Sequence, residues 1–530
     1  MVLFVLLGCA VRTTSPAAPS APAEAPGACT LLAINDTYRI EPLADGTGGL
    51  ARVRTLREEL EARFGDVVLL HAGDFLYPSL MSRTYQGRQM TEILGALDGD
   101  PAALDPRMYV VFGNHEFDAG KWKDAPGLDE TIAGSGFRWL GSNVTFATGP
   151  DGARVEDEKI VPADLVDCGG LRVGVYGVTT DRSHPAYVEA FEDPVAVGRR
   201  HATALRNAGA DYVVALTHQS LDEDRAMVEA LGADAPDLVI GGHEHDRQQL
   251  LVNGVPVRKA DADARSAWRV TVRRAADGTI AREEALVALD ASIPEDPAVK
   301  ALVDARLVAH DQAFCTARGE PAGCLGAEVG RTKVPLVAGE LDIRRFETNV
   351  GNWVADQARA AYPDADIALV NSGSLRLNRD LAPGPITRQD IEETFAYPMP
   401  LVRLEIDGAT LRKVLARAVE AWTGNGHWLQ VSGLAWVHDP VAGTASKPTL
   451  LPDGRPIADT DRLVVVVPAF LADPSTGQDG YTMLPAAASL TGPDLKQLVL
   501  DALAGDADGI APVVEGRICN PARPGPCLAR

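Results

Sequence analysis

The sequence lacks several features that would point to whole classes of protein. None of its apolar runs reaches the roughly 18 residues that a membrane-spanning helix needs. Its seven cysteines form no Cys-x-x-Cys motif, which argues against thiolate zinc sites and thioredoxin-like redox sites. Basic residues are few, since 50 Lys and Arg face 73 Asp and Glu and give a formal charge of −23. Such an acidic protein is a poor binder of nucleic acid, and an anionic substrate would need a local positive centre such as bound metal ions.

The chain is long enough for more than one domain. It has 530 residues, of which 46% are hydrophobic and 23% charged, an ordinary globular composition. Patterns typical of strands and helices alternate in both large parts of the chain, which predicts α/β domains. We expect a signal and tether over residues 1–29, a first domain over 30–295, a linker helix and Cys loop over 296–325, and a second domain over 326–530.

The amino terminus is typical of an exported bacterial lipoprotein. Residues 1–9 read MVLFVLLGC, and a tract rich in Pro, Ala and Ser follows up to Gly27. In this interpretation Cys9 carries the lipid and the tract is an extended tether. A plain cleaved signal is the alternative, because no Lys or Arg precedes the apolar run. We therefore expect a periplasmic or cell-surface protein that contacts a membrane only through a lipid anchor at Cys9.

The other six cysteines suit an oxidising compartment. Two pairs flank short loops rich in turn residues, and the remaining two cysteines each stand at the start of a predicted strand. Since disulfides persist outside the cytoplasm, we expect three of them, with buried free thiols as the alternative. The expected pairs are Cys29–Cys168, Cys315–Cys324 and Cys519–Cys527.

Five patterns of buried strands in the first domain each end in a polar cluster. They read TLLAIND (30–36), DVVLLHAGD (66–74), MYVVFGNHE (108–116), DYVVALTHQ (211–219) and DLVIGGHEH (237–245). Because ligands bind beyond the carboxyl ends of strands in α/β sheets, we expect these clusters to meet in space. The side chains of these clusters are carboxylates, imidazoles and one amide, and none is a thiolate. Such a set of ligands suits Mn, Zn, Fe or Co. There are more ligands than one ion needs, which predicts two divalent ions bridged by a carboxylate.

These clusters resemble the motifs of a known family. Five motifs of the first domain are similar to those of calcineurin-like metallophosphoesterases. They are Asn35-Asp36, Gly73-Asp74, GNHEFD (113–118), Thr217-His218 and GGHEH (241–245). Four motifs of the second half are similar to those in the second domain of the 5′-nucleotidase family. They are ETNVGN (347–352), NSGSLR (371–376), VSGL (431–434) and GQDGY (477–481). The two sets extend over about residues 30 to 515. The resemblance implies a four-layer αββα sandwich followed by a second α/β domain that binds substrate.

The resemblance also implies a role for each polar residue of the first domain. The implied metal ligands are Asp36 and His245 for one ion, Asn114, His218 and His243 for the other, and Asp74 between them. His115 would be the catalytic histidine, with Asp118 as the carboxylate that orients its ring. An imidazolium at this position would stabilise negative charge that develops on phosphoryl oxygens.

Tyr38 departs from the family pattern, which usually has His two residues after the first Asp. A phenol ionises near pH 10 and is a poor metal ligand while it stays neutral. Two interpretations follow. Either Tyr38 is a phenolate ligand, or it donates a hydrogen bond and the first ion has one ligand fewer.

The second domain is expected to bind the leaving group of the substrate. The implied contacts are Arg344, Asn371, Arg376, Tyr397, Phe470 and Asp479. Tyr397 and Phe470 would hold a nucleobase between their rings, and Asp479 would contact the ribose. The alternative is that both rings are core residues. Tyr397 stands in the sequence AYPM, where the family has Pro-Phe-x-Asn.

Together these features predict an exported phosphomonoesterase with two metal ions that acts on 5′-nucleotides. The alternatives on the same scaffold are a sugar phosphate, a nucleotide-sugar diphosphate or a sulfur ester as substrate. The alternative from another class is a non-catalytic, nucleotide-binding lipoprotein. His115 and Asp118 favour an enzyme, because a protein that only binds nucleotides has no need of them.

Overall fold

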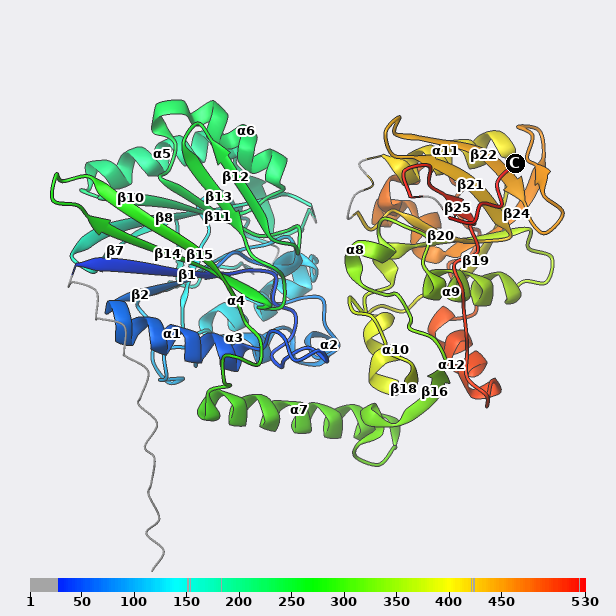
Figure 1. Cartoon of the computed structure of the whole chain (residues 1–530), viewed down its shortest axis with the longest axis horizontal. Helices are drawn as coiled ribbons and strands as arrows, with labels where there is room; N and C mark the ends of the chain where they lie inside the picture. The colour runs from blue at the N-terminus through cyan, green and yellow to red at the C-terminus, as the bar shows by residue number, and fades with distance from the viewer. Residues whose placement is uncertain are drawn as a thin grey trace, which may run out of the picture.

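A computed structural model of the chain describes residues 27–530 except 150, 151, 153, 183, 421, 423, 424 and 524. The chain forms two α/β halves, which helix α7 (Pro297–Arg318) joins along one side (Figure 1). The predicted signal and Cys9 lie outside the described residues. None of the described helices combines the length and the hydropathy that a bilayer crossing requires.

Two β-sheets pack face to face in the N-terminal half. Apolar strand residues such as Leu31, Val68 and Val214 fill the layer between them. The seven-stranded sheet has the order β15-β14-β1-β2-β3-β4-β6 and the six-stranded sheet the order β12-β13-β11-β10-β8-β7. The bounds of the first are β1 Ala28–Ile34, β2 Val67–His71, β3 Met108–Val111, β4 Arg138–Leu140, β6 Ile160–Val161, β14 Ser266–Arg274 and β15 Ile280–Ala288. Those of the second are β7 Ala163–Cys168, β8 Leu171–Thr179, β10 Tyr212–His218, β11 Leu238–Gly241, β12 Gln248–Val252 and β13 Val255–Lys259.

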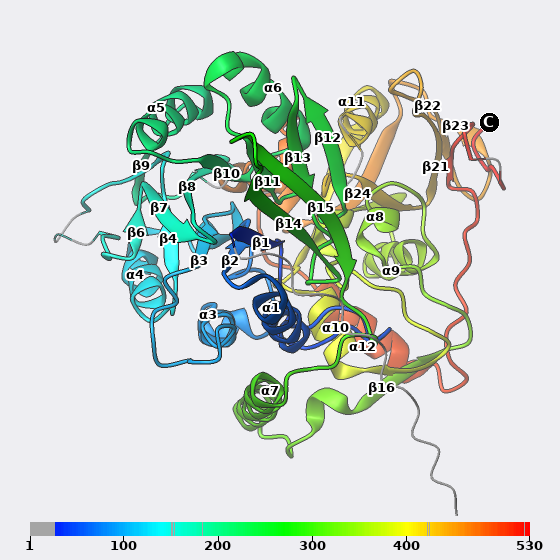
Figure 2. The ribbon, with the colours of Figure 1, turned by 60° about the vertical axis from the view of Figure 1, so that its left-hand side comes forward.

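Helices cover the outer face of each sheet (Figure 2). On the seven-stranded sheet, helix α1 (Leu50–Phe64) buries Leu50, Val53, Leu56 and Leu60, which recur at helical spacing. Helices α5 (Pro194–Asn207) and α6 (Leu221–Leu231) cover the six-stranded sheet. The order helix, sheet, sheet, helix confirms the predicted four-layer sandwich. The remaining elements are α2 Ser82–Tyr85, α3 Arg88–Leu94, α4 Ala125–Ala133, β5 Val144–Phe146 and β9 Val188–Phe191.

The central strands of each sheet run parallel, so their carboxyl ends meet at one edge. Ile34 of β1 lies beside His71 of β2, and Thr217 of β10 lies beside Gly241 of β11. The loops that follow these strands therefore leave the sheets together, as the sequence predicts.

The C-terminal half contains two four-stranded sheets, β19-β24-β17-β20 and β23-β22-β21-β25, and the pair β16-β18. The strand bounds are β16 Glu328–Thr332, β17 Ile367–Asn371, β18 Gly384–Thr387, β19 Leu401–Asp407, β20 Leu429–Ser432, β21 Leu434–Asp439, β22 Thr444–Leu450, β23 Arg455–Pro456, β24 Arg462–Pro468 and β25 Ile518–Cys519. The helices are α8 Glu340–Ile343, α9 Asn349–Ala360, α10 Arg388–Thr394, α11 Gly408–Val419 and α12 Leu495–Gly505. Strand β24 ends at Pro468, where the chain turns into a short 3₁₀ helix.

Helix α7 has clear start and stop signals. The side chain of Asp296 accepts hydrogen bonds from the first turn, and Gly319 ends the helix with φ at 69°. The predicted division of the chain at residues 295 and 325 stays a prediction.

All three expected disulfides form, and the free-thiol alternative is wrong. Cys29–Cys168 joins β1 of one sheet to β7 of the other. Cys315–Cys324 closes the loop after α7, and Cys519–Cys527 closes a loop near the carboxyl terminus.

Candidate metal centre

The polar clusters that follow β1, β2, β3, β10 and β11 meet at the shared edge of the two sheets. Asp36, Asp74 and His245 form one group whose ligand atoms all lie within 4.8 Å of one another, and Asp74, His218 and His243 form a second. Asp74 is common to both groups. Asn114 joins the second, since its Oδ1 lies 3.1 Å from His243 Nδ1. The structure thus brings together all six side chains that the sequence singled out as metal ligands.

The backbone at these ligands is held in an uncommon conformation. The φ angles are 49° at Asp36, 59° at Asp74, 90° at His243 and 62° at His245. Residues other than glycine seldom adopt such angles, and those that do are concentrated at functional sites. Gly113 is required by close packing, because a Cβ there would lie 2.1 Å from Asp74 Oδ1.

Two buried polar atoms at the centre have no hydrogen-bond partner. Asp36 Oδ2 accepts hydrogen bonds from the Asn35 side chain and the His243 backbone, but Asp36 Oδ1 accepts none. His218 Nδ1 lies 2.7 Å from the carbonyl oxygen of Ala72, but its Nε2 forms no hydrogen bond. Unpartnered buried atoms are costly unless a ligand satisfies them. Because these atoms are carboxylate oxygen and imidazole nitrogen, they fit divalent metal ions.

The buried charges at the centre shift the pKa values of its side chains in different directions. Burial disfavours a charged imidazole at His218, but Asp74 and Asp36 outweigh this effect and raise its pKa to about 9. Burial and the neighbouring His218 lower the pKa of His243 to about 3, so that His243 is neutral. Burial alone would raise the pKa of Asp74, yet His218 and His115 hold it far below its ordinary value. An ionised carboxylate and a neutral imidazole are the protonation states that bind metals, so Asp74 and His243 are already in them and His218 would release a proton when an ion binds.

Tyr38 lies next to the residues of the first group. Its hydroxyl donates to Asp74 Oδ2 over 3.2 Å and lies 3.0 Å from His245 Nε2. Burial raises the pKa of Tyr38, and the charges of Asp74 and Asp36 raise it further, well above 10. This geometry is that of the hydrogen-bond interpretation, in which the Tyr38 hydroxyl donates to Asp74.

The expected catalytic pair stands beside the two groups. His115 Nδ1 lies 3.0 Å from both carboxylate oxygens of Asp118, and His115 Nε2 lies 4.0 Å from Asp74 Oδ2. Burial opposes the imidazolium, but Asp118 and Asp74 raise the pKa of His115 above its ordinary value. Tyr397 of the other half donates its hydroxyl to Asp118 Oδ2 over 3.0 Å. The ring expected to hold a nucleobase is thus hydrogen-bonded to the carboxylate that orients His115.

The other residues expected to contact substrate lie in several places. Arg376 lies 5.8 Å from the centre of the Tyr397 ring, and Asn371 donates to Asp479 over 2.9 Å. Arg344 forms an ion pair with Glu340. Phe470 follows β24 with 39% of its surface exposed, and Tyr397 is 45% exposed, so neither ring is a core residue.

Two acidic residues with important contacts were not assigned a role from the sequence. Glu116 is buried and accepts hydrogen bonds from the backbone of Asp74, Phe75, Leu76 and Gly113, which fixes two metal-binding loops to each other. Its place in the GNHEFD motif was the available signal. Glu340 Oε2, on α8, lies 2.5 Å from His245 Nδ1, and no local sequence pattern predicts this contact between the halves.

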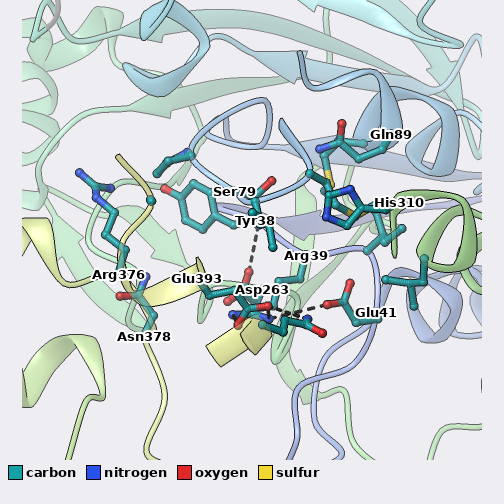
Figure 3. A pocket seen from close by; sticks show the side chains of 18 of the residues that line it. Tyr38, Arg39, Glu41, Ser79, Gln89, Asp263, His310, Arg376, Asn378 and Glu393 are labelled. Carbon is teal, nitrogen blue, oxygen red and sulfur yellow. Dashed lines mark hydrogen bonds and ion pairs between the residues drawn. The ribbon is translucent and has the colours of Figure 1, made fainter. Parts of the chain in front are cut away.

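A cavity of about 330 Å³ lies between the halves, with Tyr38 of the N-terminal half and Arg376 of the C-terminal half in its lining (Figure 3). Tyr38 and His245 line it from the N-terminal half, and Arg376 and Asn378 line it from the C-terminal half. The ion pair of Arg39 with Glu393, at 3.0 and 2.8 Å, crosses between the halves in its wall. A cavity lined by both polar and apolar side chains beside a candidate metal centre is suited to a small substrate.

Two family models match the chain. The calcineurin-like phosphoesterase model covers residues 29–247, and the model of the 5′-nucleotidase C-terminal domain covers residues 328–486. A snake venom 5′-nucleotidase of Naja atra is 28% identical over 512 residues, which include 86% of this chain and 91% of that protein. The 5′-nucleotidase of Bos taurus is 24% identical over 520 residues, 87% of this chain and 85% of that protein.

Solved structures resemble the whole chain. A 5′-nucleotidase precursor from Thermus thermophilus has a TM-score of 0.79 and 25% identity, and the match covers 94% of this chain and 100% of that one. A sulfate thiohydrolase, SoxB, from the same genus shares the fold with a TM-score of 0.70 and 17% identity, over 93% of this chain and 97% of that one.

Proposed function

Because the chain belongs to the 5′-nucleotidase family of calcineurin-like phosphoesterases and is a hydrolase, we propose that it releases phosphate from 5′-nucleotides at a centre of two metal ions. The convergence of six ligand side chains around the shared Asp74 is the observation that supports this proposal. Asp36 and His245 would hold one ion, and Asn114, His218 and His243 the other. When bound, the two divalent cations supply charge neutralisation for a phosphoryl group and a water of lowered pKa.

The protein side chains would position the substrate and stabilise the charge of the reaction. Asp118 holds the His115 ring through Nδ1, which leaves Nε2 facing the centre. An imidazolium there would donate its Nε2 proton to a phosphoryl oxygen as negative charge develops. Arg376 lines the adjoining cavity and would bind an anionic group of the substrate.

The relatives support a nucleotide as substrate, since those from snake venom and mammals are named 5′-nucleotidases. The alternative substrates drawn from the sequence are not favoured by these comparisons, and neither is a non-catalytic protein. The exposed ring of Phe470 and the pair of Asn371 with Asp479 offer a surface for a base and a ribose.

Removal of the Phe470 ring tests the substrate class. Stacking on one aromatic ring contributes about 1–3 kcal/mol per base in single-strand binders, so Phe470→Ala should raise KM for AMP by about tenfold or more. Hydrolysis of p-nitrophenyl phosphate should stay nearly unchanged, because it has no base to stack. Tyr397 is a poorer choice, since its hydroxyl also contacts Asp118.

Val441→Ala provides the matched control, because it truncates a highly exposed apolar side chain in the same half. Equal effects of Phe470→Ala on AMP and on p-nitrophenyl phosphate would argue against a nucleobase at this ring. A panel that includes sugar phosphates and UDP-sugars would then identify the preferred class.

We also propose that the protein is exported and anchored by a lipid at Cys9. Three disulfides support an oxidising compartment. Cys9→Ala should move the protein from the membrane fraction to the soluble fraction of a bacterial host. A variant that stayed with the membrane would contradict the anchor.

A further inference from the structure

We propose that Glu340 of the C-terminal half orients His245 for its metal ion, and so completes the first metal site across the interface between the halves. This inference rests on the two-metal function proposed above. Glu340 begins helix α8, and its Oε2 lies 2.5 Å from His245 Nδ1. The two residues are 95 positions apart in the sequence and belong to different halves.

The two ring nitrogens of His245 face different surroundings. Nε2 lies 3.0 Å from the Tyr38 hydroxyl and 3.3 Å from Asp36 Oδ1, which places it on the side of the metal ligands. Nδ1 faces Glu340. Histidines that bind metals usually donate the other ring N–H to a carboxylate or carbonyl, which fixes the tautomer and the ring orientation and increases the basicity of the ligand atom. Glu340 occupies the position of that carboxylate.

Glu340 is itself held in place by Arg344, one turn further along the chain. Arg344 Nη1 lies 2.7 Å from Glu340 Oε1, and the side chains of the pair are only 14% and 11% exposed. A buried carboxylate is costly without charged or hydrogen-bonding partners, and Glu340 has one on each oxygen. Arg344 was expected to contact substrate, but in this arrangement it is a positioning residue that directs Glu340 towards His245.

Among the described histidines of the candidate metal centre, only His245 has a ring nitrogen that contacts a carboxylate of the C-terminal half. Nδ1 of His218 faces the carbonyl oxygen of Ala72 within the N-terminal half, and His243 Nδ1 lies beside Asn114, which would bind the same ion. Since binding equilibria are reciprocal, an ion at the first site and the contact between the halves should stabilise each other. Loss of the Glu340 charge should therefore weaken one site and leave the other unchanged.

Glu340→Gln tests this prediction, because it removes the charge while it keeps the size of the side chain. Metal-free protein is titrated with Mn²⁺ by isothermal titration calorimetry, and bound ions are counted after gel filtration. We expect the affinity of one site to fall by about 10–100-fold, the usual effect of losing such a partner, and that of the other to stay the same. Glu340→Asp keeps the charge and should weaken the same site less.

Asp342→Asn is the matched control. It removes a carboxylate from the same helix, two residues away from the one that contacts His245. This variant should bind both ions as the unaltered protein does. Circular dichroism and thermal unfolding establish that each variant is folded, and Glu340→Asp carries the test if Glu340→Gln fails to fold.

Three results separate this inference from the function on which it rests. Unchanged affinity at both sites in folded Glu340→Gln would overturn the inference alone. A single bound ion in the unaltered protein would overturn both the inference and the two-metal centre. Two bound ions in the unaltered protein, with the affinity for one of them lowered by Glu340→Gln, would support the inference even if no nucleotide were hydrolysed. In that case only the substrate proposal would fail.

Discussion

Replacing Asp74 with alanine should remove both metal ions and abolish hydrolysis. Asp74 is the only residue common to the two ligand groups found among the described residues of the centre. Its Oδ2 lies 3.1 Å from His218 Nε2 and 3.2 Å from the Tyr38 hydroxyl, so the side chain faces both groups. Bound ions supply several kcal/mol of transition-state stabilisation, and their loss should lower turnover by about a thousandfold or more.

The measurement is metal content per chain, determined by mass spectrometry after gel filtration, together with phosphate release from AMP. Asp167→Ala is the control, because Asp167 lies on β7 of the same half with its side chain 92% exposed. This control should keep two ions and full activity. Two ions per chain in folded Asp74→Ala would show that Asp74 does not bridge them.

The position of the metal centre could be predicted from the sequence because it depends on strand order alone. A buried strand that ends in Asp, Asn or His places that residue at the carboxyl edge of its sheet, and parallel strands share this edge. Asp36 and Asp74 come together in this way at one sheet, and the face-to-face packing of the two sheets adds His218 from the other. The alternation of buried strands with helical patterns predicts only an α/β domain, and the helix–sheet–sheet–helix order was implied by the resemblance to calcineurin-like metallophosphoesterases.

The contacts between the halves could not be predicted from the sequence. They depend on how the two halves pack against each other, and no periodicity encodes that arrangement. Tyr397 illustrates the point, because its ring matched a base-binding position but its hydroxyl bonds to Asp118. Glu340 and Arg344 were placed by the same packing, and only the structure shows that Glu340 contacts His245 and that Arg344 pairs with Glu340. Residues at an interface carry functions that a motif within one domain cannot specify.

His115 should contribute to turnover without contributing to metal binding. It belongs to neither ligand group, and its link to the centre is its backbone N–H, which donates to Asp74 Oδ1 over 2.8 Å. Alanine keeps that N–H, so His115→Ala should retain both ions. The lost imidazolium would otherwise stabilise charge on the phosphoryl oxygens, a contribution typical of about 10²–10⁴-fold in kcat.

The His115 variant should be assayed for kcat and KM on AMP, with its ion count measured in the same preparation. Asp118→Asn is the informative partner, because it keeps the ring but removes the carboxylate 3.0 Å from Nδ1 that orients and charges it. We expect a smaller loss of kcat in Asp118→Asn than in His115→Ala, since a misoriented imidazole still reaches the centre part of the time. Near-normal turnover of His115→Ala would exclude a catalytic role, and the loss of an ion from this variant would make His115 a metal ligand instead.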